Sequence, residues 1–207
     1  MSDAQNIVHI SSLLASRLCH DLVNPVGALS TGLDVLGEGD DPEMQAHAMA
    51  LIKESTHKTI AILTLARLAY GSSGGWEGDL DMGEAKPLAT DFFVHSKAEL
   101  VWKLTESAMA KPRARALLCL LIIAERTAPR AGSQVVIAKE GEGYTVTATG
   151  PKVKFSDEVR QAVAGDVQNL QAKETPAYLA YLLCQAQGDT VSAHQPDEQI
   201  LIFKIQP

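Results

Sequence analysis

Four side chains that can take part in nucleophilic or acid–base chemistry lie within eight positions near the start of the chain: Arg17, His20, Asp21 and Asn24. An exposed histidine has a pKa near 6.5, so about three-quarters of such imidazoles are neutral at pH 7 and carry a free lone pair. Asp21 can accept the proton of the other ring nitrogen or only orient the ring, and either role keeps the attacking nitrogen available. The cluster therefore predicts a functional role for His20.

The apolar residues around this cluster recur at three- and four-residue steps, which is typical of a helix that packs against other helices. They are Ile7, Ile10, Leu14, Leu18, Leu22, Pro25, Leu29, Leu33 and Leu36. At about 100° per residue, His20 lies roughly 160° from this apolar face. A histidine buried in the core is thereby excluded, and we expect His20 to face solvent.

A second helix follows after a tight turn. The first helix is predicted at residues 3–36, and the turn at residues 37–41. Asp41 is suited to cap the next helix and Pro42 to occupy its first position, and that helix continues to about residue 70. Its predicted packing side consists of Met44, Ala48, Ile52, Ser55, Thr59, Leu63 and Ala66.

This antiparallel hairpin has one apolar stripe on each helix and little within itself to cover it. A second copy solves the problem, because four helices enclose a core that two cannot. We therefore expect a homodimer with a four-helix bundle. Its shared core is predicted to contain Leu14, Leu18, Leu29 and Leu33.

The chain changes character after the glycine- and serine-rich residues 71–75. We divide it into a helical hairpin (1–72), a linker (73–82) and a second domain (83–207). The order of elements in this domain predicts an α/β fold. The expected elements are helix 85–96, strand 99–104, helix 111–127, strands 134–139 and 144–148, helices 156–164 and 176–187, and strands 190–193 and 200–204.

The motif CHDLVNPV at residues 19–26 resembles the H-box of histidine kinases, in which His, an acidic residue, two variable residues, Thr or Asn, and Pro follow one another. The matching residues are His20, Asp21, Asn24 and Pro25. In that family the H-box lies on a hairpin that dimerises into a four-helix bundle, and an ATP-binding α/β domain follows. The resemblance implies an α + α/β fold, with an ATPase-like sandwich of a mixed sheet and helices on one face.

The residues that bind the nucleotide in histidine kinases have no counterparts in this chain. Cys119 and Ile123 stand where the N-box asparagines belong, and Mg²⁺ on ATP needs oxygen ligands there. Ala148 stands in place of the adenine-binding carboxylate. Glu174 and Pro176 replace the glycine-rich phosphate-binding segment, which needs close backbone approach and free N–H donors. We therefore expect that this domain does not bind ATP.

A phosphorylatable histidine without its own ATP site resembles the ChpT-type histidine phosphotransferases along essentially the whole chain. This resemblance implies a carrier in a bacterial phosphorelay. The donor would be the receiver domain of a hybrid, CckA-type kinase, and the acceptors would be CtrA- and CpdR-type response regulators of the cell cycle. Two alternatives stay open: a pseudokinase dimer that scaffolds or inhibits a partner kinase, and an active kinase with an unusual ATP site.

The resemblance assigns a role to each member of the cluster. Phosphoryl transfer depends on positioning and charge neutralisation, so Asn24 can orient the phosphoryl group and Arg17 can neutralise it. The receiver would supply Mg²⁺, and this chain needs no cofactor or metal of its own. For each of the three neighbours of His20, a plain solvated helix-surface position is the alternative interpretation.

A docking surface for the receiver should surround His20. The same angular argument turns small and apolar residues of the first helix outward, together with three residues of the second helix, and one arginine of the second domain is a further candidate. These residues are Leu13, Val23, Gly27, Thr31, Ala50, Glu54, His57 and Arg160. Scattered surface residues without a partner are the competing interpretation.

Composition excludes several other functions. A net charge of −7 and a pI near 5.3 argue against nucleic-acid binding. Three widely spaced cysteines form neither a CxxC metal motif nor a disulfide framework, and the remaining histidines lack zinc-site spacing. The longest apolar run, residues 116–124, is too short to cross a bilayer, and the first residues do not form a signal peptide. We therefore expect a cytoplasmic protein.

Overall fold

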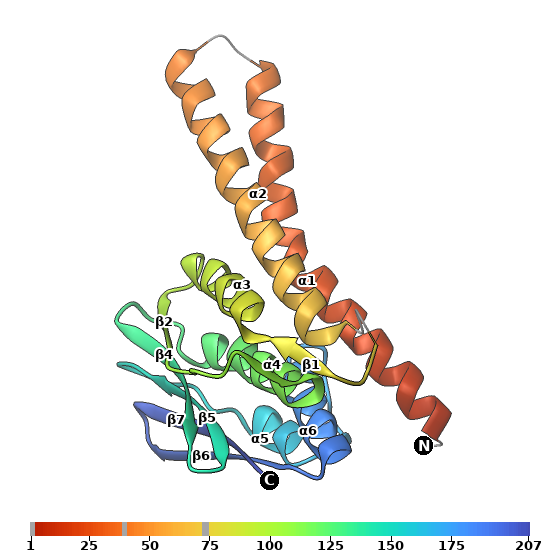
Figure 1. Cartoon of the computed structure of the whole chain (residues 1–207). Coiled ribbons are helices and arrows are strands. Elements are labelled where there is room, and N and C mark those ends of the chain that lie inside the picture. The colour runs from red at the N-terminus through yellow and green to blue at the C-terminus, as the bar shows by residue number, and fades with distance from the viewer. Residues whose placement is uncertain (1–2, 39–40, 72–74) are drawn as a thin grey trace.

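The computed structural model describes residues 3–38, 41–71 and 75–207. Helices α1 (Asp3–Glu38) and α2 (Pro42–Tyr70) form an antiparallel hairpin that projects from the rest of the molecule (Figure 1). The Asp41 side chain accepts a hydrogen bond from the backbone N–H of Glu43 at 3.0 Å, and Pro42 begins α2. The predicted hairpin and its capping residue are therefore confirmed.

Packing within the hairpin follows the predicted apolar face only in part. Pro25 is buried, whereas Ile7 and Leu33 of the same face are 65% and 60% exposed in the single chain. Gly32 marks a close approach of the two helices, because a Cβ at this position would lie 2.6 Å from Cγ1 of Ile52. One hairpin thus leaves large apolar side chains uncovered.

The second domain is built on a five-stranded mixed sheet in the order β2-β4-β5-β7-β6. Its strands are β2 (Ala98–Trp102), β4 (Ser133–Glu140), β5 (Gly143–Thr149), β6 (Thr190–Asp197) and β7 (Ile200–Gln206). β2 and β4 are parallel, and the other neighbouring pairs are antiparallel. Alternate residues of β4 and β7, among them Val135, Ile137, Leu201 and Phe203, are buried. The predicted α/β sandwich is confirmed.

Helices α4 (Lys111–Thr127), α5 (Asp157–Val163) and α6 (Thr175–Gln187) lie on one face of this sheet (Figure 1). Helix α3 (Met82–Val94) packs beside α2 and next to β2. Residues 114–124 of α4 are all buried, since α4 packs between the sheet, α6 and the hairpin. This central position explains the unbroken apolar run in the sequence.

Two short strands were not predicted. β1 (Asp79–Asp81) pairs antiparallel with β3 (Ala108–Ala110), and their central residues Leu80 and Met109 are buried. Asp81 then caps α3 by accepting from the backbone N–H of Gly83 at 2.7 Å. The segment 73–82 is therefore not a linker throughout, because its end belongs to the folded second domain, while residues 72–74 lie outside the described residues.

The base of the hairpin is fixed to the second domain. The buried guanidinium of Arg115, on α4, donates to the carbonyl oxygens of Ala69 and Tyr70 at 3.2 and 2.9 Å. These carbonyls belong to the last turn of α2 and have no partner within the helix. Within the described part of the chain, neither the hairpin helices nor any other helix has the continuous apolar length that crossing a bilayer requires.

Candidate functional site

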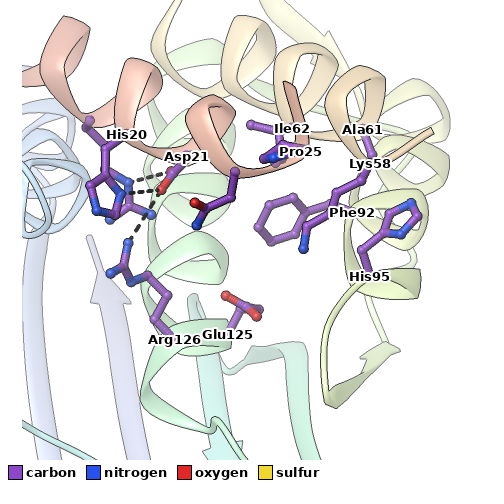
Figure 2. A pocket seen from close by; sticks show the side chains of 12 residues that line it. His20, Asp21, Pro25, Lys58, Ala61, Ile62, Phe92, His95, Glu125 and Arg126 are labelled. Atoms are coloured by element: carbon purple, nitrogen blue, oxygen red, sulfur yellow. Dashed lines mark hydrogen bonds and ion pairs between the residues drawn. The ribbon is translucent and has the colours of Figure 1, made fainter. Parts of the chain in front are cut away.

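His20 lies at a cavity of about 280 Å³ between the hairpin and the second domain. Its side chain is 72% exposed, as the helical periodicity predicts. The cavity is lined from three sides: by α1, by Lys58 and its neighbours on α2, and by Phe92, His95 and Arg126 of the second domain (Figure 2). The exposed imidazole of the motif therefore stands where the two domains meet.

Asp21 is the centre of the polar contacts at this cavity. Its Oδ1 atom lies 3.5 Å from Nδ1 of His20 and 3.6 Å from Nη1 of Arg126, and its Oδ2 atom accepts from Nε of Arg17 at 2.6 Å (Figure 2). Because Nδ1 faces the carboxylate, Nε2 is the ring nitrogen left to react. A carboxylate in this position favours the tautomer with the proton on Nδ1.

Arg17 differs from its expected role. It is buried, with 3% of its surface exposed, and its Nη1 atom donates to the backbone carbonyl of Lys173 at 2.9 Å. Since Nε is already bonded to Asp21, the guanidinium is engaged on two sides rather than free for a phosphoryl group. Arg17 therefore orients Asp21 and connects α1 to the segment that precedes α6.

The structure brings the four residues of the motif together at one cavity, since Arg17, His20, Asp21 and Asn24 all line it. Asn24 is exposed there, one helical turn from His20. The buried Pro25 lies beside it in the same wall. A functional asparagine remains a prediction, but its location agrees with it.

The predicted docking residues are placed unevenly. Those of the hairpin that are exposed are Val23, Gly27, Thr31, Ala50, Glu54 and His57. Leu13 is largely buried, contrary to the outward position expected. Arg160 lies on α5 and does not line the cavity; it is 3.6 Å from Asp157, and its guanidinium stacks over the ring of Phe155.

Sequence reasoning missed the residues that the second domain brings to the cavity. Arg126 and Glu125 come from the last turn of α4, and His95 follows α3. Glu125 accepts a hydrogen bond from the hydroxyl of Ser96 at 2.9 Å, and burial raises the pKa of its carboxyl. Burial and then the charge of Arg17 lower the pKa of Arg126, but an arginine stays protonated at neutral pH. Nothing in the local sequence around Arg126 signals its approach to Asp21.

The positions matched to the nucleotide-binding boxes lie in the protein core. Cys119, Ile123 and Ala148 are buried, and Sγ of Cys119 is 3.8 Å from the carbonyl oxygen of Ala69 on α2. Glu174, directly before α6, is buried, and its Oε2 atom has no hydrogen-bond partner in the described structure. Burial raises the pKa of this carboxyl. The described residues contain no cluster of three or more metal-ligating side chains.

Comparison with known proteins agrees with this architecture. Residues 82–199 match the family described as the histidine phosphotransferase C-terminal domain. The protein phosphotransferase ChpT of Brucella abortus (strain 2308) is 32% identical over 198 residues, which cover 93% of this chain and 93% of that protein. The chain belongs to the ChpT-type histidine phosphotransferases. A solved structure of a bacterial phosphotransferase matches this ChpT-type chain with a TM-score of 0.82 and 28% identity over 96% of both chains.

Proposed function

We propose that this protein carries a phosphoryl group on His20 within a multi-step phosphorelay. It accepts the group from the receiver aspartate of a CckA-type hybrid histidine kinase and passes it to receivers of CtrA- and CpdR-type response regulators. Membership of the ChpT-type family supports this role. The observation that carries it is the exposed imidazole of His20, with Nδ1 facing Asp21 and Nε2 open to a partner.

The residues at the cavity support the chemistry of the transfer. The lone pair of Nε2 attacks phosphorus, an N–P bond forms, and the P–O bond to the receiver aspartate breaks, so that its electron pair leaves on the aspartate carboxylate. The proton on Nδ1 stays in place, and the carboxylate of Asp21 balances the positive charge of the phosphorylated ring. Mg²⁺ would come with the receiver, whose carboxylates hold it.

We further propose that the second domain does not use ATP. The positions that would hold Mg²⁺ and adenine are occupied by the buried side chains of Cys119, Ile123 and Ala148, none of which offers an oxygen ligand. Pro176 at the start of α6 lacks an N–H donor, and Glu174 places a carboxylate where phosphates would need positive charge. The phosphoryl group on His20 must then come from a phosphorylated partner.

The hairpin also supports a homodimer. Its exposed apolar side chains are too many for a lone surface helix pair and would be covered in a four-helix bundle. On α1 and α2 they include Val26, Leu33, Met44, Met49, Leu51, Ile60 and Leu63. Leu18, which the sequence placed in the shared core, instead lines a small cavity with Tyr70 and Ile122 of its own chain. Leu33 is therefore the better probe of dimerisation.

The test is to mix the purified full-length protein with a receiver domain phosphorylated on its aspartate. We expect acid-labile, base-stable label on the wild type and none on His20→Ala. His47→Ala is the matched control, because His47 is an exposed histidine of α2 that does not line the cavity. Label on His20→Ala would overturn the assignment of His20 as the carrier. Labelling of the wild type by Mg-ATP alone would overturn the proposal that the second domain does not use ATP. A wild type that binds the receiver without becoming labelled would support the scaffold instead.

A further inference from the structure

We propose that Arg126, on the second domain, binds the phosphoryl group while it resides on His20, so that the domain without an ATP site contributes a cation to the phosphotransfer site. This inference rests on the proposed function of His20. It assigns a direct chemical task to a residue that no feature of the hairpin motif indicates.

The first support is the position of the guanidinium. Nη1 of Arg126 and Nδ1 of His20 approach the same atom, Oδ1 of Asp21, at 3.6 and 3.5 Å. Figure 2 shows the imidazole reaching down from α1 and the guanidinium reaching up from α4 at the same end of the cavity. A phosphoryl group bonded to Nε2 would enter the space beside this guanidinium.

The second support is the difference between the two arginines at Asp21. Arg17 is buried, bonds Oδ2 at 2.6 Å and is held by the Lys173 carbonyl. Arg126 is 38% exposed and stands 3.6 Å from Oδ1, well beyond the distance of about 2.7–2.9 Å that a strong charged hydrogen bond takes. Arg17 thus supplies the structural ion pair of Asp21, and Arg126 is the cation available to a new anion.

The third support is the charge that arrives. A phosphoryl group brings up to two negative charges and three acceptor oxygens, and a planar guanidinium can bind two such oxygens at once. Among the described residues, the basic side chains of Arg17, Arg126 and Lys58 line the cavity with only two carboxylates, those of Asp21 and Glu125, so positive charge is in excess there. Binding to the phosphoryl group uses this excess without breaking the short Arg17–Asp21 pair.

The scaffold around Arg126 fixes where the guanidinium can reach. It extends from the last turn of α4, whose preceding residues are buried. Its neighbour Glu125 turns to the Ser96 hydroxyl instead. Lys58 is the other exposed cation that lines the cavity, but it stands on α2 of the hairpin. Substitutions of Arg126 and of Lys58 therefore distinguish phosphoryl binding by the second domain from phosphoryl binding by the hairpin alone.

The experiment follows the partition of label between a phosphorylated receiver and His20 at equilibrium. We expect Arg126→Ala and Arg126→Gln to shift this partition toward the receiver by about tenfold or more, which corresponds to about 1.4 kcal/mol. Arg126→Lys should recover part of the loss, because it keeps the charge but not the planar fork. Arg130→Ala is the matched control, since Arg130 is exposed just beyond α4 and does not line the cavity.

Two further readouts separate this role from a structural one. Affinity for the unphosphorylated receiver and the thermal unfolding temperature of Arg126→Gln should match those of the wild type. If the partition for both Arg126→Ala and Arg126→Gln stays within twofold of the wild type, Arg126 does not bind the phosphoryl group. If the Arg126 variants leave the partition unchanged and Lys58→Ala shifts it, the hairpin binds the phosphoryl group through Lys58. Both outcomes leave the carrier role of His20 intact, whereas label on His20→Ala would remove that role itself.

Discussion

Nη1 of Arg17 donates a hydrogen bond to the backbone carbonyl of Lys173, 2.9 Å away and 156 residues later in the chain. The same guanidinium holds the carboxylate of Asp21 at 2.6 Å. The orientation of Asp21, and through it that of the His20 ring, therefore depends on how the second domain packs against the hairpin. The second domain therefore helps to set the geometry around His20.

Removing the carboxylate of Asp21 should destabilise the protein and slow phosphotransfer. In Asp21→Asn the buried guanidinium of Arg17 loses its charged partner, and hydrogen bonds to charged groups are worth about 1.5–3 kcal/mol. We expect a decrease of that size in the free energy of unfolding, measured by urea denaturation. The double variant Arg17→Met with Asp21→Asn should recover part of it, and strictly additive losses would contradict the coupling.

Substitution by alanine at two glycines of α1 should change the stability of the protein in opposite directions. At Gly32 a Cβ would lie 2.6 Å from Cγ1 of Ile52 and 3.2 Å from the carbonyl oxygen of Ala48, so α1 and α2 must move apart. Overpacking of this kind costs about 1–3 kcal/mol. At Gly27 no atom lies within 4 Å of the added Cβ, and the higher helix propensity of alanine should stabilise the helix by about 1 kcal/mol. The thermal unfolding temperature should decrease for Gly32→Ala and increase for Gly27→Ala. Equal changes in the two variants would contradict the prediction.

The proposed dimer should be sensitive to charge at Leu33. This side chain is 60% exposed in one chain, and burial in a bundle makes its loss worth about 2–5 kcal/mol in each copy. We expect Leu33→Asp to be monomeric at micromolar concentration in light scattering. Val94→Asp, at a valine of α3 that is 72% exposed, should remain dimeric. A monomeric wild type would rule out the four-helix bundle.

Glu174 should make the stability of the protein decrease as the pH rises. Burial raises the pKa of its carboxyl above the ordinary value, so the folded state disfavours the ionised form. Below the ordinary glutamate pKa the group is protonated in both states and has no effect. Above it the unfolded state ionises first, and the folded state loses stability until its own, higher pKa is passed. Relative to Glu174→Gln, the wild type should therefore lose stability as the pH rises above the ordinary glutamate pKa. Urea midpoints that stay parallel for the two proteins as the pH rises would contradict the prediction.

Helical periodicity and helix-capping residues were sufficient to predict the hairpin from the sequence. Three- and four-residue spacing predicts both long helices and turns His20 outward, and Asp41 with Pro42 marks the start of α2, because all of these depend on contacts within a few residues of the chain. The order of helices and strands in the second domain was predicted for the same reason. The absence of the residues typical of the nucleotide-binding boxes is likewise recognisable from the linear sequence.

Only the tertiary structure decided how the site is completed. Helical periodicity describes each helix by itself, so it could not show that the second domain would bury Arg17 or bring Arg126 to Asp21 from a helix more than 100 residues away. The pairing of β1 with β3 was missed because each strand has three residues and is stabilised by a partner far along the chain. Leu18 faces Tyr70 and Ile122 for the same reason. Long-range packing places these groups, and no local pattern in the sequence encodes it.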